Sequence, residues 1–161
     1  MLFNSLQYYV FALIVIPLFF LLDHKRQKDL LLISSIYFYS SLKLAFLPLI
    51  VFSFTATYFF TLGIDHKNKT KDRLYLLATL TVNLGMLFFF KYTDFVRSSV
   101  FDLESMIGLK HNEDFKAIGF ILPLGISFYT FQAIAYTVDV YRKEIKVEKS
   151  YKDFFLFLLF F

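Results

Sequence analysis

Four polar side chains recur at helical spacing within an otherwise apolar stretch, Gly119–Arg142: Tyr129, Gln132, Tyr136 and Asp139. At about 100° per residue, their offsets of 0, 3, 7 and 10 place them within an arc of about 80° on a helix. Phenol, amide and carboxylate groups can hydrogen-bond a polar substrate or brace a neighbouring helix, and lipid would leave them unpaired. We therefore expect this stripe to face protein or water, and we treat its members as candidates for a substrate channel.

Two residues that disturb helices precede the stripe in the same stretch. Pro123 removes one backbone donor and crowds the preceding turn, and Gly125 tolerates non-helical backbone, so we expect a kink or break there. Broken helices line substrate cavities in membrane proteins, but kinked helices also serve as purely structural elements. The residues alone leave both interpretations of the stripe open: a cavity wall or a packed helix interface.

Two charged residues lie where apolar segments end. Lys91 follows the aromatic run Phe88–Phe90. Its stem can cover apolar surface while the ammonium reaches the membrane interface, and a position on a substrate path is the alternative. Asp139 is either the last member of the stripe or the first residue of a charged collar. Both residues are kept as substrate-channel candidates.

Groups suited to acid–base or metal chemistry are missing from the predicted membrane interior. The three histidines, His24, His66 and His111, each lie in a polar loop, and none has a second ligand at a metal-binding spacing. The chain has no cysteine, which excludes thiolate chemistry and disulfides. We therefore predict neither a metal site nor a catalytic residue within this chain.

The overall composition is that of a membrane protein. Hydrophobic residues make up 58% of the 161 residues, well above the roughly half expected of a soluble globular chain. The 17 Lys and Arg exceed the 13 Asp and Glu, but they are spread over several loops rather than gathered in one patch. This distribution argues against a nucleic-acid surface and favours loops that set membrane topology.

Apolar runs along the chain predict five membrane-spanning helices and the start of a sixth. The predicted spans are Leu6–Leu22, Leu30–Leu42, Leu44–Ile64, Leu74–Phe90 and Ala117–Tyr141, followed by the apolar ending Phe154–Phe161. Between the fourth and fifth spans, Val96, Val100, Leu103 and Ile107 recur at helical spacing, which predicts a short helix lying in the membrane interface. We expect an all-α, polytopic protein in which residues 1–161 form a single integral membrane region with no soluble domain.

The basic residues of alternate loops predict the orientation. The loops after the first, third and fifth spans, beginning with the polar loop Asp23–Asp29, hold twelve Lys and Arg in total, and the other two loops hold five. Because Lys and Arg are enriched in cytoplasmic loops, we expect the N-terminus outside and the three basic loops in the cytoplasm.

Three segments of the sequence resemble the membrane-bound O-acyltransferases, on the branch of alginate-type bacterial polysaccharide O-acetylases. The longest is LPLGISFYTFQAIAYTVDVYR, which includes Pro123, Gly125 and Arg142 as positions of its structural motif. The others are the opening MLFNSLQYYVFALIV and the run FFFKYTDF at Phe88–Phe95.

This resemblance implies a multi-pass enzyme of the bacterial inner membrane that passes an acetyl group to a hydroxyl of an exported polysaccharide. The implied donor is acetyl-CoA or another activated acetyl carrier, and a periplasmic acetylation partner is a further implied component. The family's catalytic histidine lies beyond the motif seen here. We therefore expect this chain to be the N-terminal part of such an enzyme, inactive without the missing C-terminal part, with Tyr129, Gln132, Tyr136 and Asp139 lining or bracing the reaction chamber.

Two other functions are compatible with the sequence. A D-alanyl transferase of teichoic acids uses the same general fold and differs in its donor and acceptor. A small membrane transporter or interaction protein could use the broken helix to line a permeation path, although a transporter should carry a second broken segment in its other half.

Overall fold

The computed structural model describes residues 5–42, 44–106 and 125–160, and the regular structure in these ranges is entirely helical. The elements in chain order are α1 (Leu6–Leu21), α2 (His24–Leu42), the short 3-10 helix η1 (Leu44–Phe46), α3 (Leu47–Leu62), α4 (Lys69–Met106), α5 (Ile126–Arg142) and α6 (Tyr151–Leu159). The predicted all-α class is confirmed.

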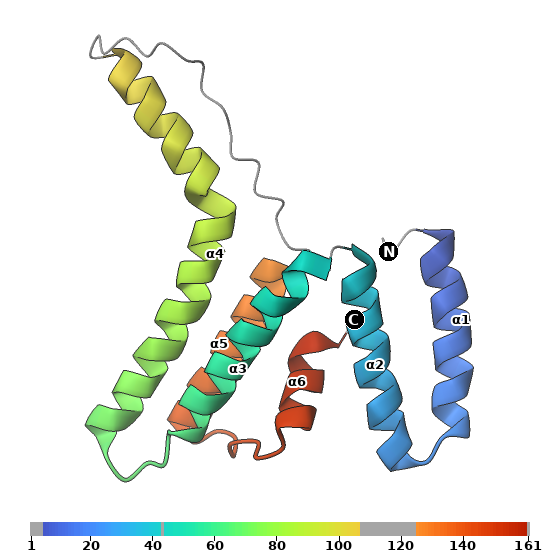
Figure 1. Cartoon of the computed structure of the whole chain (residues 1–161). Coiled ribbons are helices and arrows are strands. Elements are labelled where there is room, and N and C mark those ends of the chain that lie inside the picture. Colours follow the sequence, from blue (N-terminus) through green and yellow to red (C-terminus); the bar gives the residue numbers. More distant parts are fainter. Residues whose placement is uncertain (1–4, 43, 107–124, 161) are drawn as a thin grey trace.

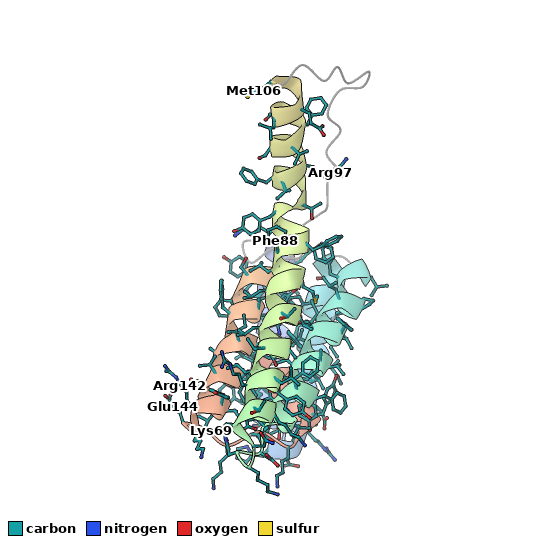
Figure 2. The ribbon with its side chains drawn as sticks, turned by 90° about the vertical axis from the view of Figure 1, so that its left-hand side faces the viewer. Lys69, Phe88, Arg97, Met106, Arg142 and Glu144 are labelled. Atoms are coloured by element: carbon teal, nitrogen blue, oxygen red, sulfur yellow. The ribbon has the colours of Figure 1, made fainter. Side chains whose placement is uncertain are left out.

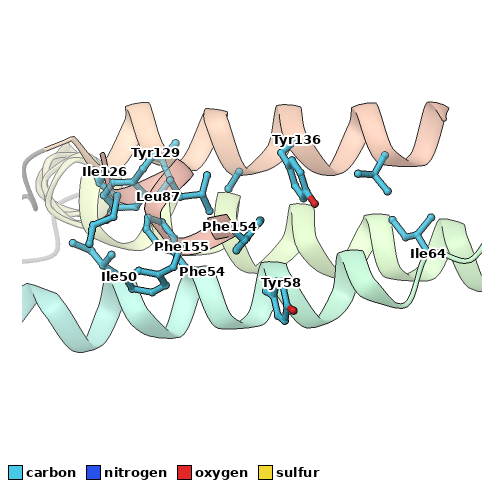
Figure 3. Close-up of a cluster of buried hydrophobic side chains, with 14 residues drawn as sticks. Ile50, Phe54, Tyr58, Ile64, Leu87, Ile126, Tyr129, Tyr136, Phe154 and Phe155 are labelled. Carbon is cyan, nitrogen blue, oxygen red and sulfur yellow. The ribbon is translucent and has the colours of Figure 1, made fainter. Parts of the chain in front are cut away.

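The helices form a bundle with α3, α4 and α5 packed together and with α6 placed between this group and α2 (Figure 1). Helix α1 lies at the edge, where it packs against α2. Buried apolar side chains from α3, α5 and α6 form the centre of the core, including Phe54, Tyr58, Tyr129, Tyr136, Phe154 and Phe155 (Figure 3). Helix α6 therefore completes the core although it is only 9 residues long.

The number of membrane spans is not confirmed. Within the described ranges, one helical segment, Lys69–Thr93, is long and apolar enough by length and composition to cross a membrane. The apolar helices Leu6–Leu21 and Leu47–Leu62 are shorter, at 16 residues each. At about 1.5 Å per residue, such helices reach about 24 Å, less than the roughly 30 Å of a typical hydrocarbon core.

Two predicted boundaries are wrong. The polar loop predicted at Asp23–Asp29 is mostly helical, because α2 begins at His24. Polar contacts support this early start: the side chain of Gln27 donates to the backbone oxygen of Phe19 over 3.1 Å, and Lys28 and Asp29 both form ion pairs with α6. The charged residues therefore belong to the first turns of the helix.

The short interface helix predicted after the fourth span is part of a longer helix. The structure has no separate helix there, because α4 continues without interruption from Lys69 to Met106 over 38 residues. The part of α4 after Lys91 contains neither proline nor glycine, so nothing in its backbone chemistry ends the helix. It extends past the ends of α3 and α5 (Figure 1), whereas Ile107 lies outside the described residues.

The three basic connections lie at one end of the bundle. The α1–α2, α3–α4 and α5–α6 connections all lie at the lower end in Figure 1. Since these segments and the turns beside them carry twelve of the 17 Lys and Arg residues, the fold concentrates positive charge at one end. The orientation of this end relative to a membrane stays a prediction.

Candidate functional site

The candidate site is the polar stripe of α5, whose helix begins directly after Gly125. Gly125 has left-handed backbone geometry, with φ 77° and ψ 4°, which interrupts an α-helix. A Cβ atom built there would lie 3.7 Å from the Tyr39 hydroxyl and 3.9 Å from Cδ1 of Tyr129. Helix α5 therefore begins at a glycine that allows this conformation, and the predicted break of a longer helix stays a prediction because Pro123 lies outside the described residues.

Tyr136 packs against α6 and forms a hydrogen bond with the connection between α5 and α6. Its ring is buried and packs edge-on against Phe154, with ring centroids 5.1 Å apart (Figure 3). Its hydroxyl accepts a hydrogen bond of 2.7 Å from the backbone N–H of Glu148. Next to it, the Tyr58 hydroxyl donates to the backbone oxygen of Lys149 over 2.5 Å. Two tyrosine hydroxyls therefore hold the backbone of this basic connection against the bundle.

Gln132 forms a hydrogen bond with the C-terminal end of α6. Its Nε2 donates a hydrogen bond of 2.9 Å to the backbone oxygen of Phe157. Phe157 lies in the last turn of α6, where carbonyl groups have no partner within the helix. The amide of Gln132 supplies that partner, so the stripe braces α6 at two points along its length.

The first and last members of the stripe have different surroundings. Tyr129 is 2% exposed and its ring packs edge-on against Phe54, with centroids 5.5 Å apart. Among the described residues, its buried hydroxyl has no hydrogen-bond partner. Asp139 is half-buried near the end of α5, where its backbone oxygen accepts from the N–H of Glu144 over 2.9 Å. The structure therefore brings Tyr129, Gln132 and Tyr136 against the core and α6, and leaves Asp139 at the end of the helix.

The remaining predicted residues lie apart from the stripe. Lys91 is exposed on α4, and its Nζ lies 5.5 Å from the ring centroid of Tyr92. Arg142 is the last residue of α5, at the basic end of the bundle (Figure 2), and its Nη1 lies 3.7 Å from Oε1 of Glu144. Neither side chain makes a described contact with Tyr129, Gln132 or Tyr136, and the assignment of Lys91 to a substrate channel stays a prediction.

The two described histidines lie in the basic part of the fold and not at the stripe. His24 begins α2, and Nδ1 of His66, in the α3–α4 connection, lies 3.9 Å from Oδ2 of Asp72. His111 falls outside the described ranges. No cluster of three or more His, Cys, Asp or Glu side chains suited to a metal ion is found among the described residues.

Two grooves flank the stripe. The first, of about 540 Å³, lies between α2, α5 and α6 and is lined by Leu31, Phe128, Gln132, Leu156, Phe157 and Phe160. Gln132 is the single polar side chain among the described residues that line this groove. The second, of about 280 Å³, opens at the basic end and is lined by Tyr136, Ile145, Lys146, Glu148, Asp153, Phe154 and Phe157. The second groove therefore combines apolar side chains with the charged side chains of Lys146, Glu148 and Asp153.

A buried hydrogen-bond network joins α3, α4 and α5, and the sequence analysis missed it. Asn83 is 1% exposed; its Oδ1 accepts from the Ser53 hydroxyl over 2.9 Å, and its Nδ2 donates to the Thr57 hydroxyl over 2.8 Å. Further along, the hydroxyls of Thr61 and Thr137 lie 3.0 Å apart. Asn83 is the only amide side chain in the apolar run of α4, and that isolation was the available signal.

Two ion pairs between α2 and α6 were also missed. Nζ of Lys28 lies 2.8 Å from Oδ1 of Asp153, and Lys152 pairs with Asp29. The hydrogen bond from Lys28 lowers the pKa of the Asp153 carboxyl below its ordinary value. These residues are more than 120 positions apart in the sequence, so no local pattern indicated the pairing.

Comparisons with known proteins agree with the resemblance drawn from the sequence. The chain is 38% identical over 114 residues to a peptidoglycan O-acetyltransferase of Helicobacter pylori, covering 70% of this chain and 20% of that protein. It is 32% identical over 155 residues to the probable alginate O-acetylase AlgI of Pseudomonas syringae, covering 95% of this chain and 29% of that protein. The AlgI protein of Azotobacter vinelandii is 32% identical over 159 residues, with 94% and 31% covered.

The chain thus spans between a fifth and a third of the length of these relatives. No family model matches the chain, and no solved structure matches it.

Proposed function

This chain belongs to the alginate-type branch of the membrane-bound O-acyltransferases, and we propose that it forms the N-terminal part of an enzyme that acetylates hydroxyls of an exported polysaccharide. The observation that carries the proposal is the similarity to a probable alginate O-acetylase along 95% of the chain. Alginate and peptidoglycan are the two candidate acceptors, and the 38% identity to a peptidoglycan O-acetyltransferase favours keeping peptidoglycan beside alginate.

The proposed setting is the bacterial inner membrane, with five spans, the N-terminus outside and the basic end of the bundle in the cytoplasm. The gathering of the three basic connections at one end supports this orientation. The donor would be acetyl-CoA or another activated acetyl carrier reaching the enzyme from the basic end. Lipid would cover the apolar faces, and the acceptor polysaccharide, with any periplasmic acetylation partner, would approach from the opposite end.

Within this enzyme, the stripe would shape the wall of the chamber rather than perform chemistry. The hydrogen bonds of Gln132 and Tyr136 to α6 and its preceding connection support a bracing role. Acetyl transfer needs a base that accepts the proton of the acceptor hydroxyl. Among the described residues, no histidine lies beside the stripe, so we propose that the base comes from the C-terminal part of the enzyme and that this chain is inactive alone.

A chimera tests the proposal. In the Pseudomonas syringae relative, the 155 matched residues are replaced by those of this chain, and the chimera is produced in cells that lack their own polysaccharide O-acetylase. Acetyl groups released by mild alkali from the exported polysaccharide are then measured. We expect acetylation with the chimera and none with the 161-residue chain alone.

Two results would contradict the proposal. Acetylation by the chain alone would show that the base lies within it. A chimera that accumulates in the membrane yet transfers no acetyl group would show that this chain does not supply the function of the matched segment.

A further inference from the structure

Helices α2 and α6 carry the same Lys-Asp dipeptide close to their N-terminal ends, as Lys28–Asp29 in α2 and Lys152–Asp153 in α6. Nζ of Lys28 lies 2.8 Å from Oδ1 of Asp153. In the same way, Lys152 pairs with Asp29. The charge of Lys152 also adds to the hydrogen bond from Lys28 in lowering the pKa of the Asp153 carboxyl. These four residues form a charge quartet in which the signs alternate and the net charge is zero.

The two helices that the quartet joins run side by side in the same direction. Both begin at the basic end of the bundle, and they pack against each other (Figure 1). Helix N-termini carry partial positive charge, so two of them placed together repel each other. Each dipeptide brings a carboxylate to this end, and the carboxylate of the other helix compensates its lysine. The quartet therefore makes the parallel arrangement electrostatically favourable.

The quartet discriminates between registers of α6 more than it adds to overall stability. Its side chains are between 31% and 54% exposed, and exposed ion pairs contribute little. The buried side chains Phe154, Phe155, Leu158 and Leu159 attach α6 to the core, but apolar contacts are non-directional and tolerate a slip along α2. A slip that brings the same positions of the two dipeptides together places lysine beside lysine and aspartate beside aspartate, which repel.

The register of α6 decides the contacts of the stripe on α5. Gln132 donates to the backbone oxygen of Phe157 within α6. Tyr136 accepts from the backbone N–H of Glu148 in the connection just before α6. A slip of one helical turn would displace these backbone groups by about 5.4 Å, which is more than a hydrogen bond can span.

From this geometry we propose that the charge quartet sets the register of α6 along α2 and thereby positions the hydrogen bonds of Gln132 and Tyr136. Its members are positioning residues, whose effect on a ligand passes through α6 and the stripe. Their effect on α6 is independent of acetyl transfer, whereas an effect on acetylation rests on the proposed function.

Two charge swaps test the quartet. In the first variant, Lys28→Asp with Asp153→Lys gives two adjacent aspartates on α2 and two adjacent lysines on α6. The helices still attract each other, but either aspartate can meet either lysine, so the charges no longer select the register. In the second variant, Asp29→Lys and Lys152→Asp are added. This fourfold swap restores the alternation of signs and the original composition of each helix.

The first measurement is the amide hydrogen-exchange rate at Glu148, followed by NMR on the full chain in detergent micelles. We expect the rate to rise several-fold in the twofold swap and to return to within about twofold of the original in the fourfold swap. Asp65→Lys with Lys67→Asp is the matched control, because both residues are exposed in the α3–α4 connection and their swap also conserves the net charge. The control should leave the rate at Glu148 unchanged, and helicity should be the same in all variants.

Acetylation by the chimera is the second measurement, and it should fall several-fold in the twofold swap and recover in the fourfold swap. An unchanged rate at Glu148 in the twofold swap, or a fourfold swap that exchanges as fast as the twofold swap, would overturn the proposal. If exchange recovers in the fourfold swap and acetylation does not, the register does not position the site. If the unswapped chimera also transfers no acetyl group, the proposed function fails and the exchange result still decides the role of the quartet.

Discussion

Replacing Asn83 with leucine should loosen the packing of α4 against α3. The side chain of Asn83 makes two hydrogen bonds across this helix pair, to the hydroxyls of Ser53 and Thr57. Leucine has a similar size, so the main effect is the loss of these bonds and the burial of two unpaired hydroxyls. Interhelical hydrogen bonds in membrane proteins average about 0.6 kcal/mol and reach about 1.7 kcal/mol, so the two together correspond to roughly 1–3 kcal/mol of unfolding free energy.

The measurement is the unfolding free energy in detergent micelles, followed by far-ultraviolet circular dichroism as a denaturing detergent is added. Thr81→Leu is the matched control, because Thr81 is exposed on the same helix and should change stability by less than about 0.5 kcal/mol. A double-mutant cycle with Ser53→Ala then isolates the coupling between Ser53 and Asn83, expected at about 0.6 kcal/mol. A loss for Asn83→Leu no larger than that of Thr81→Leu, or strict additivity in the cycle, would refute this account of the network.

Three further predictions concern α5 and α6. Gln132→Leu removes the donor to the Phe157 carbonyl, so amide hydrogen exchange in the last turn of α6 should accelerate, and unchanged exchange would show that Gln132 does not stabilise this turn. Acetylation by the chimera should fall with Gln132→Leu and also with Asp139→Asn. The folded pKa of Asp153 lies below its ordinary value of 3.8, so its pair with Lys28 contributes stability above that pH and loses it as the pH falls through the lowered pKa. Lys28→Met should therefore reduce this acid-dependent loss of melting temperature, and an identical pH profile in the variant would argue against the pair. Gly125→Ala should cost about 1–2 kcal/mol because of its left-handed backbone, and Gly125→Asn should cost less in the same unfolding assay.

Several helix ends were predicted within two residues. The ends of α1 at Leu21 and of α3 at Leu62 follow from the abrupt change from apolar to charged residues, which is a local property of the chain. The start of α2 and the length of α4 could not be predicted from a change between apolar and charged residues. Charged residues can begin a helix when a neighbouring helix pairs with them, as Asp153 does with Lys28, and a polar segment without proline or glycine can continue one.

The sequence likewise predicted only part of the candidate site. Spacing alone placed Tyr129, Gln132 and Tyr136 on one face of a helix and predicted that the face meets protein or water. Their partners, α6 and the connection before it, could not be predicted, because a hydrogen bond such as that from Gln132 to Phe157 depends on how two helices dock. Lys91 was a channel candidate because of its polarity and Arg142 was a position of the family motif, and neither side chain makes a described contact with Tyr129, Gln132 or Tyr136.

The sequence by itself determined the all-α class, the concentration of charge in alternate connections and the polar stripe on α5, because each follows from composition or periodicity along one segment. The tertiary structure decided which buried polar groups meet. Ser53 and Asn83 are 30 residues apart, and Lys152 and Asp29 are 123 apart, so only the packing of α3 with α4 and of α2 with α6 brings them within bonding distance.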